Sequence, residues 1–207
     1  MARYTGPVCR LCRREGMKLY LKGEKCVTKC TFEKRSSPPG KHQQRRRKVS
    51  DFALQLREKQ KARRIYGVLE KQMKNTFEEA TEKRGATGEV LLELLEARLD
   101  NVVYRSGFAK SRSQARQLVN HGHISVNGRR TSIPSYTVKA SDTIAVVESS
   151  RTSQYFKDAL AWAKTQTRPA WLELDPESYT ARIASAPKRE QIETQVDTQL
   201  IVEHYSR

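Results

Sequence analysis

The chain has 207 residues, enough for one or two compact domains, and its 40 Lys and Arg against 23 Asp and Glu leave a formal net charge of +17. With 37% hydrophobic and 30% charged residues, it is expected to form small cores and to bind nucleic acid. The sequence shows no signal peptide and no apolar run of about 20 residues, which argues against secretion and a membrane span and predicts a cytoplasmic protein.

The positive charge is concentrated in the first 84 residues, which hold 24 basic and 9 acidic side chains. Residues 85–130 hold 7 basic and 4 acidic side chains, and residues 131–207 hold 9 and 10. The basic surface is therefore expected in the N-terminal and central parts of the chain.

The first thirty residues contain all four cysteines as two close pairs with thirteen residues between them: Cys9, Cys12, Cys26 and Cys30. Two such pairs can bring four sulfurs to one tetrahedral Zn²⁺, and four thiolates leave no open position for catalysis. Two disulfides are the alternative, although disulfides are rare in the cytoplasm. The expected cofactor is one structural Zn²⁺, with Arg13 and Arg14 among the nearby residues that offset its thiolate charge.

Residues 36–50 form a basic loop, because two prolines and a glycine exclude a regular helix. A like-charge run can be a solvated face or a localisation signal, but next to the cysteine segment it predicts phosphate contacts. The N-terminal candidates for RNA contact are Arg3, Arg13, Arg14, Lys41, His42, Arg45, Arg46, Arg47 and Lys48.

Helices are predicted on both sides of Gly67. Ser50 is the expected N-cap of the first, which carries Arg63 and Arg64 as further RNA candidates. A charged helix over residues 71–83 follows. Thr87 is the expected cap of the next helix, Glu89 to Glu96, which has five Val or Leu side chains and is expected to be buried.

The central segment, residues 98–148, combines a short helix with a hairpin. Ser111 followed by Gln114 is a capping box that begins the helix, and Gly122 supplies the left-handed residue that ends it after His121. His123–Val126 alternates like a half-buried strand, and Asn127–Gly128 is a strong hairpin signal.

The helix from Ser111 to His121 has two different faces. At about 100° per residue, Ala115, Leu118 and Val119 share one side, which we expect to be core. The opposite side is expected to be exposed, so Arg116→Glu should change stability by no more than about 0.5 kcal/mol. Residues 98–130 hold seven basic side chains and only one acidic side chain, which favours an RNA partner. The candidates in this segment are Lys110, Ser111, Arg112, Ser113, Gln114, Arg116, Gln117, Asn120, His121, His123, Asn127, Arg129 and Arg130.

The residues Ser111–Val119, His121–Ile124 and Val126–Gly128 resemble the S-four RNA-binding module, a helix-helix-strand unit that occurs in a ribosomal protein and in several RNA-modifying enzymes. The resemblance implies that the polar side of the second helix and the turn after it lie on the RNA backbone.

The C-terminal third is expected to contain strands at 143–147 and 179–183, an extended segment at 171–176 and a helix at 152–164. The last segment, with Ile192, Val196 and then 200–207, is predicted to be a helix that packs on the N-terminal helices. The expected fold class is α+β: a zinc segment and basic loop at 1–49, a helical domain at 50–97 completed by 184–207, and a mixed domain at 98–183 that holds the module.

Several short motifs together resemble the S-four family of bacterial small-subunit ribosomal proteins. They are the Met1–Tyr4 start with Gly6–Pro7, Arg13–Gly16, Pro38–His42, the module itself and the closing Val202–Arg207. The resemblance implies binding to a multi-helix junction in the 5′ domain of small-subunit ribosomal RNA early in assembly. It also implies contact with the neighbouring S-five ribosomal protein near the decoding region, and hence an effect on translational accuracy.

Two other classes of protein compete with this interpretation. A pseudouridine synthase can carry the same module, and Arg98-Leu99-Asp100 is similar to the sequence around the catalytic aspartate of those enzymes. In them, however, the aspartate follows the module, whereas Asp100 begins it, so we interpret Asp100 as a capping or salt-bridging acid in a protein that is not an enzyme. A free RNA-binding protein would leave the cysteine segment and the C-terminal helix unexplained.

Overall fold

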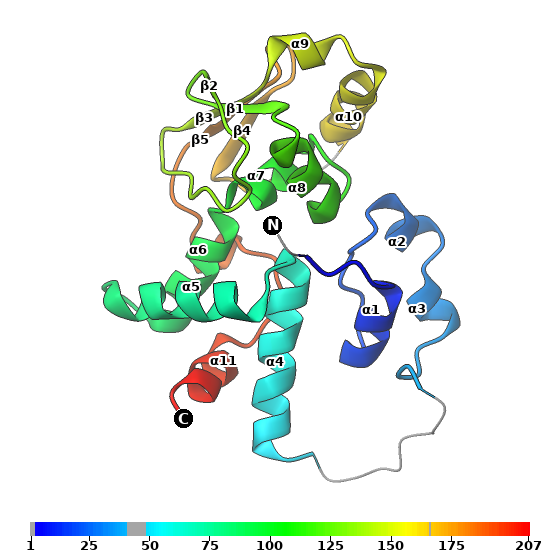
Figure 1. The fold of residues 1–207 in the computed structure, drawn as a ribbon, viewed down its shortest axis with the longest axis vertical. Helices are drawn as coiled ribbons and strands as arrows, with labels where there is room; N and C mark the ends of the chain where they lie inside the picture. The colour runs from blue at the N-terminus through cyan, green and yellow to red at the C-terminus, as the bar shows by residue number, and fades with distance from the viewer. Residues whose placement is uncertain (1–2, 41–48, 166) are drawn as a thin grey trace. The chain divides into compact units, whose positions relative to one another are not determined.

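The computed structural model describes residues 3–40, 49–165 and 167–207, and the chain divides by its contacts into two compact units (Figure 1). One unit is Met1–Leu91 with Thr194–Arg207, and the other is Leu92–Glu193. The prediction of a mixed fold with a small antiparallel sheet is confirmed. None of the helices in the described ranges has the length and apolar character that a membrane crossing requires.

The first unit begins with three short helices, α1 (Cys9–Glu15), α2 (Glu24–Thr28) and α3 (Thr31–Lys34). Gly16 ends α1 in the left-handed conformation, with φ of 69°. Arg13 holds the chain after α3, because its guanidinium donates to the carbonyl oxygens of Ser37 at 2.7 Å and of Pro38 at 3.3 Å. The start of the predicted basic loop is therefore anchored on α1.

Three longer helices follow, α4 (Asp51–Tyr66), α5 (Glu70–Glu82) and α6 (Thr87–Glu96). The predicted cap of α4 is confirmed, since the hydroxyl of Ser50 accepts a hydrogen bond from the Ala53 backbone N–H at 3.3 Å. Gly67 ends α4 with φ of 67°. The predicted burial of α6 is also confirmed, because all five of its Val and Leu side chains are buried. The boundary between the two units falls within α6, after Leu91.

The C-terminal helix α11 (Thr198–Tyr205) packs on α4 and α5 in the first unit. Its Tyr205 ring stacks on Phe77 with ring centroids 4.7 Å apart, and its Ile201 is fully buried. The helix is shorter than the sequence predicted, because Asp197 caps it by accepting from the backbone N–H groups of Gln199 and Leu200. The segment before the cap holds only the 3₁₀ helix Arg189–Gln191.

The second unit consists of α7 (Leu99–Arg105), α8 (Arg112–Asn120) and a five-stranded antiparallel sheet, followed in the chain order by helices between the strands. The strands are β1 (Ile124–Val126), β2 (Arg129–Arg130), β3 (Thr143–Val146), β4 (Leu172–Asp175) and β5 (Thr180–Ile183), in the spatial order β2-β1-β3-β5-β4. Helices α9 (Glu148–Arg151) and α10 (Gln154–Thr165) connect β3 to β4. The predicted elements of the C-terminal third are thus confirmed.

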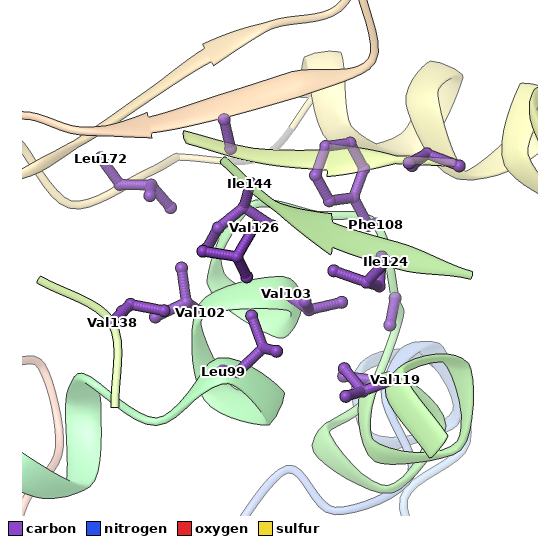
Figure 2. Packing of buried hydrophobic residues seen from close by; sticks show 14 of the residues in the cluster. Leu99, Val102, Val103, Phe108, Val119, Ile124, Val126, Val138, Ile144 and Leu172 are labelled. Carbon is purple, nitrogen blue, oxygen red and sulfur yellow. The ribbon is translucent and has the colours of Figure 1, made fainter. Parts of the chain in front are cut away.

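The core of this unit lies between α7, α8 and the sheet. Figure 2 shows Leu99, Val102 and Val103 of α7 directed toward Val126 and Ile144 of the strands. In β3 and β5 buried residues alternate with more exposed ones, so one face of the sheet carries the core. Packing against this face fixes the position and rotation of α7 and α8.

Candidate nucleic-acid interface

Helix α8 begins and ends where the sequence predicted. The hydroxyl of Ser111 accepts from the Gln114 backbone N–H at 3.3 Å, which is the first half of a capping box. The Gln114 side chain accepts from the backbone N–H of Lys110, one residue before the cap, at 3.0 Å. Gly122 follows the helix with φ of 71°. Ser111 and Gln114 therefore position the helix, and their side chains are engaged in doing so.

The two predicted faces of α8 are confirmed for most of their residues. Ala115 and Val119 are fully buried, and Leu118 is partly buried and packs against the same core. Ser113, Gln117 and Asn120 are exposed, and Arg112 is partly exposed. The polar side of the helix is thus open to a partner along its length.

The prediction that Arg116 lies on the exposed side of α8 is wrong, because only 5% of this residue is exposed. Its Nη1 donates to Oδ2 of Asp100 at 3.0 Å, and Asp100 also accepts two hydrogen bonds from Arg98, at 3.1 and 3.0 Å. The long side chain lies at the border of the core face, where it reaches the carboxylate on α7. The predicted salt-bridging role of Asp100 is confirmed, and Arg116 fastens α8 to α7.

Two other basic residues at the start of α8 are held by uncharged groups. Nε of Arg112 donates to Oδ1 of Asn101 at 2.8 Å, and its guanidinium lies 4.5 Å from the ring centroid of Tyr104. Nζ of Lys110 lies 5.4 Å from the ring centroid of Trp162 on α10. Sequence analysis did not find these three supporting residues, because each lies several turns or elements away along the chain.

The turn after α8 carries a second group of basic side chains. Arg130 folds back over Gly122 and donates to the carbonyl oxygen of His121 at 3.1 Å. A Cβ atom at Gly122 would lie 2.3 Å from Nε of Arg130 and would displace that flexible side chain, and the φ of 71° itself favours glycine. Burial, together with the nearby His121 and Arg130, lowers the pKa of His123. Nδ1 of His123 lies 2.9 Å from the hydroxyl of Ser150.

The hairpin presents two exposed arginines, Arg129 and Arg130, in β2. The predicted Asn127–Gly128 turn is confirmed, with φ of 49° and 79° and with Val126 paired to Arg129. The Asn127 side chain donates to Asp142 at 2.8 Å and accepts from the Thr143 backbone N–H at 2.9 Å. Asn127 therefore shapes the turn that displays the two arginines.

The basic candidates of the first unit have mixed surroundings. Arg3 and Arg14 are exposed. Arg63 pairs with Glu70 at 2.8 Å, and Arg64 pairs with Glu15, whose side chain is only 2% exposed. The guanidinium groups of Arg63 and Arg64 are thus engaged in ion pairs within the chain, which the sequence did not predict. Lys41, His42, Arg45, Arg46, Arg47 and Lys48 lie outside the described residues.

The four cysteines are not joined by disulfides; Cys9 is partly buried and the other three are buried. As the side chains stand, no three His, Cys, Asp or Glu residues in the described ranges form a ready metal-binding group. The thiols are nevertheless close enough to act on one another. Burial is the main cause that raises the pKa of Cys12, a backbone hydrogen bond from Leu19 opposes it, and the neighbouring thiols of Cys26, Cys9 and Cys30 raise it further.

Comparison with protein families defines the class of this chain. A family model described as the Ribosomal protein S4/S9 N-terminal domain matches residues 3–96, and one described as the S4 domain matches residues 97–144. The second match covers α7, α8 and the hairpin, and the last two of these carry the exposed polar and basic side chains. The class is therefore that of proteins in which an S4 domain follows a ribosomal N-terminal domain.

Curated relatives match over the full length of the chain. Small ribosomal subunit protein uS4A of Symbiobacterium thermophilum is 62% identical over 208 residues, and uS4 of Pelotomaculum thermopropionicum is 59% identical over 208 residues. The uS4 protein of Thermus thermophilus is 57% identical over 209 residues, and each of the three alignments covers 100% of both chains. The chain belongs to the uS4 family of small ribosomal subunit proteins.

Proposed function

We propose that this protein is a structural constituent of the small ribosomal subunit in the cytoplasm and binds ribosomal RNA. The observation that carries the proposal is the exposed polar side of α8, continued by Arg129 and Arg130 of the hairpin, in a chain of the uS4 family. Proteins recognise folded RNA mainly through backbone phosphates, 2′-hydroxyls and shape, because the A-form major groove is too deep and narrow for side chains to read. An exposed surface of arginine, amide and hydroxyl groups suits such contacts.

Binding to defined RNAs tests this proposal. The full chain is expected to bind a multi-helix junction from the 5′ domain of small-subunit ribosomal RNA more tightly than a random-sequence duplex of equal length, and to co-sediment with the small subunit. Equal affinity for both RNAs together with absence from the subunit would contradict the proposal.

The same junction is the proposed starting point of an assembly role. We propose that the protein binds early, without other proteins, and so nucleates folding of the 5′ domain. In stepwise reconstitution, omission of this chain should then block proteins that join later. Omission of a late protein should not affect the binding of this chain.

We also propose contact with the S-five protein and, through it, an effect on translational accuracy. Cross-linking in intact subunits and misreading assays on interface variants test that contact.

We propose further that Cys9, Cys12, Cys26 and Cys30 hold one structural Zn²⁺. In support, the three other thiols lie close enough to Cys12 to raise its pKa, and the Lys22 backbone N–H lies 3.3 Å from Sγ of Cys26, as a thiolate favours. Four sulfur ligands suit a closed tetrahedral site, although the thiols must turn toward a common centre to form it. Zinc bound there would fix the loop between α1 and α2.

Metal analysis of freshly purified protein tests the zinc proposal, with one zinc per chain expected. Chelation should loosen the segment before α4 and leave the other helices folded, since their cores contain no cysteine. Protein without zinc but with two disulfides by mass would overturn the proposal.

The surroundings of Asp100 remove the main support for the alternative that this chain is an enzyme. That carboxylate is 3% exposed and accepts from two arginines, so it is not placed to attack a substrate. The relatives named above are ribosomal proteins, and the proposed role includes no catalysis.

A further inference from the structure

The start of α8 carries two cations, each of which lies over an aromatic ring from another helix. Arg112 lies 4.5 Å from the ring centroid of Tyr104 on α7, and Lys110 lies 5.4 Å from that of Trp162 on α10. Both distances are within the range of about 6 Å in which the face of a ring attracts a cation. Both contacts lie within the unit Leu92–Glu193.

Asn101 restrains Arg112 from a second direction. It is 2% exposed, and its Nδ2 donates to the backbone oxygen of Glu96 at 2.9 Å and to Oε2 of the same residue at 2.6 Å. Because the amide nitrogen is occupied in this way, Oδ1 is left to accept from Nε of Arg112, at 2.8 Å. The direction of the Arg112 side chain is therefore set by a buried amide and by a ring.

These supports differ from that of Arg116 in their charge. A carboxylate offsets the charge of Arg116, whereas Asn101, Tyr104 and Trp162 are neutral. A neutral support orients a cation without itself cancelling the positive charge. Arg112 and Lys110 are both partly exposed, on either side of the cap residue Ser111.

We propose that Asn101, Tyr104 and Trp162 are positioning residues for RNA binding, which hold Arg112 and Lys110 in the direction of the sugar-phosphate backbone. The inference rests on the proposed function and specifies how its main surface works. An oriented side chain loses less rotamer freedom when RNA binds, so removal of one support should weaken binding about two- to tenfold.

Paired substitutions at Tyr104 separate the ring from the rest of the side chain. In the full chain, with the junction RNA as probe, the conservative variant Tyr104→Phe should retain binding because the ring remains. Tyr104→Leu should weaken binding about two- to tenfold while its melting curve still shows a folded protein. The same comparison is made with Trp162→Phe and Trp162→Leu. Equal affinities for the Phe and Leu variants at both positions would overturn the inference.

A double-mutant cycle shows whether the support acts through Arg112. In an Arg112→Gln background, Tyr104→Leu should cause no further loss of affinity, whereas a purely structural effect would cause the same loss in both backgrounds and overturn the inference. Arg112→Lys leaves α7 intact, keeps the charge and removes the planar group and the Nε donor. It should therefore weaken binding even if Tyr104→Leu does not fold, and parent-like binding of Arg112→Lys would overturn the inference.

The parent protein separates this inference from the proposed function. If the parent does not bind the junction RNA, the proposed function fails and the inference fails with it. If the parent binds and the Leu and Lys variants bind equally well, only the positioning role is overturned.

Discussion

The α7–α8 contact of the second unit and the α1–α4 contact of the first unit each place one carboxylate between two arginines. Asp100 uses both of its oxygens, accepting two hydrogen bonds from Arg98 and one from Arg116. Glu15 meets Arg57 and Arg64 with the single oxygen Oε1. Burial raises the pKa of Glu15 and lowers that of Arg64, although each attracts the other.

The two clusters differ in geometry, and geometry is expected to decide what each buried ion pair contributes. Attraction between buried charges compensates for lost hydration only where the hydrogen bonds are well formed. The bidentate Asp100 cluster meets that condition better than the Glu15 cluster does. The arginines of this basic protein are not equivalent, since Arg116 and Arg64 pair with carboxylates, whereas Arg112 is partly exposed and contacts an amide and a ring.

The largest expected effect is that of Arg116→Glu, which places two carboxylates together in a buried site. Removing one partner of a buried pair costs about 3–5 kcal/mol, and repulsion from Asp100 should add to this loss. The matched control is Gln117→Glu at the exposed neighbouring position, expected to change stability by no more than about 0.5 kcal/mol. Urea unfolding measures both, and similar stabilities for the two variants would show that Arg116 is solvated.

Asp100→Ala should have the next largest effect on stability, because it leaves Arg98 and Arg116 buried without their shared acceptor. We expect a loss of about 3–5 kcal/mol in the free energy of unfolding. Asp158→Asn, at an exposed acid of α10, serves as the control and should stay within about 0.5 kcal/mol of the parent. A small effect of Asp100→Ala would remove the distinction between the two clusters.

Glu15→Gln should have a smaller effect that depends on pH. The pKa of Glu15 in the folded chain is raised above its ordinary value of 4.5, so between these two values the folded chain holds a proton that the unfolded chain has released. The stability that Glu15 contributes is therefore fully present below pH 4.5 and is lost as the pH rises through the folded pKa. Unfolding of parent and variant from acidic to neutral pH should show the parent losing stability relative to Glu15→Gln. If the parent instead gained stability relative to the variant, attraction to the arginines would outweigh burial in setting the pKa of Glu15.

The smallest expected effects separate arginines on RNA from arginines in ion pairs. Arg129→Gln, in the exposed hairpin, should reduce the log-log salt slope of RNA affinity by roughly 0.7–0.9 if one phosphate contact is lost. Arg64→Gln should leave the slope unchanged, because Glu15 already compensates the Arg64 charge. Binding isotherms at several salt concentrations measure both slopes, and a reduced slope for Arg64→Gln would place that residue on RNA.

Local signals determined much of the fold and part of the candidate surface. The caps at Ser50 and Ser111, the left-handed Gly122 and the Asn127–Gly128 turn were predictable because each depends on a few adjacent residues. The family itself was predictable from motifs spread along most of the chain. The zinc site stays a prediction.

Only the tertiary structure decided which charges are used inside the protein. Asp100 and Arg116 lie sixteen residues apart, and Glu15 and Arg64 lie forty-nine apart, so no local pattern reveals either pair. Helical periodicity gives the direction in which a side chain leaves the helix, but a long arginine at the border of a face bends toward whatever acceptor the packing brings near. The sequence by itself therefore determined where α8 begins and ends and which of its sides faces the core. Packing against α7 and α10 decided that Arg116 is buried while Arg112 and Lys110 are held partly exposed over aromatic rings.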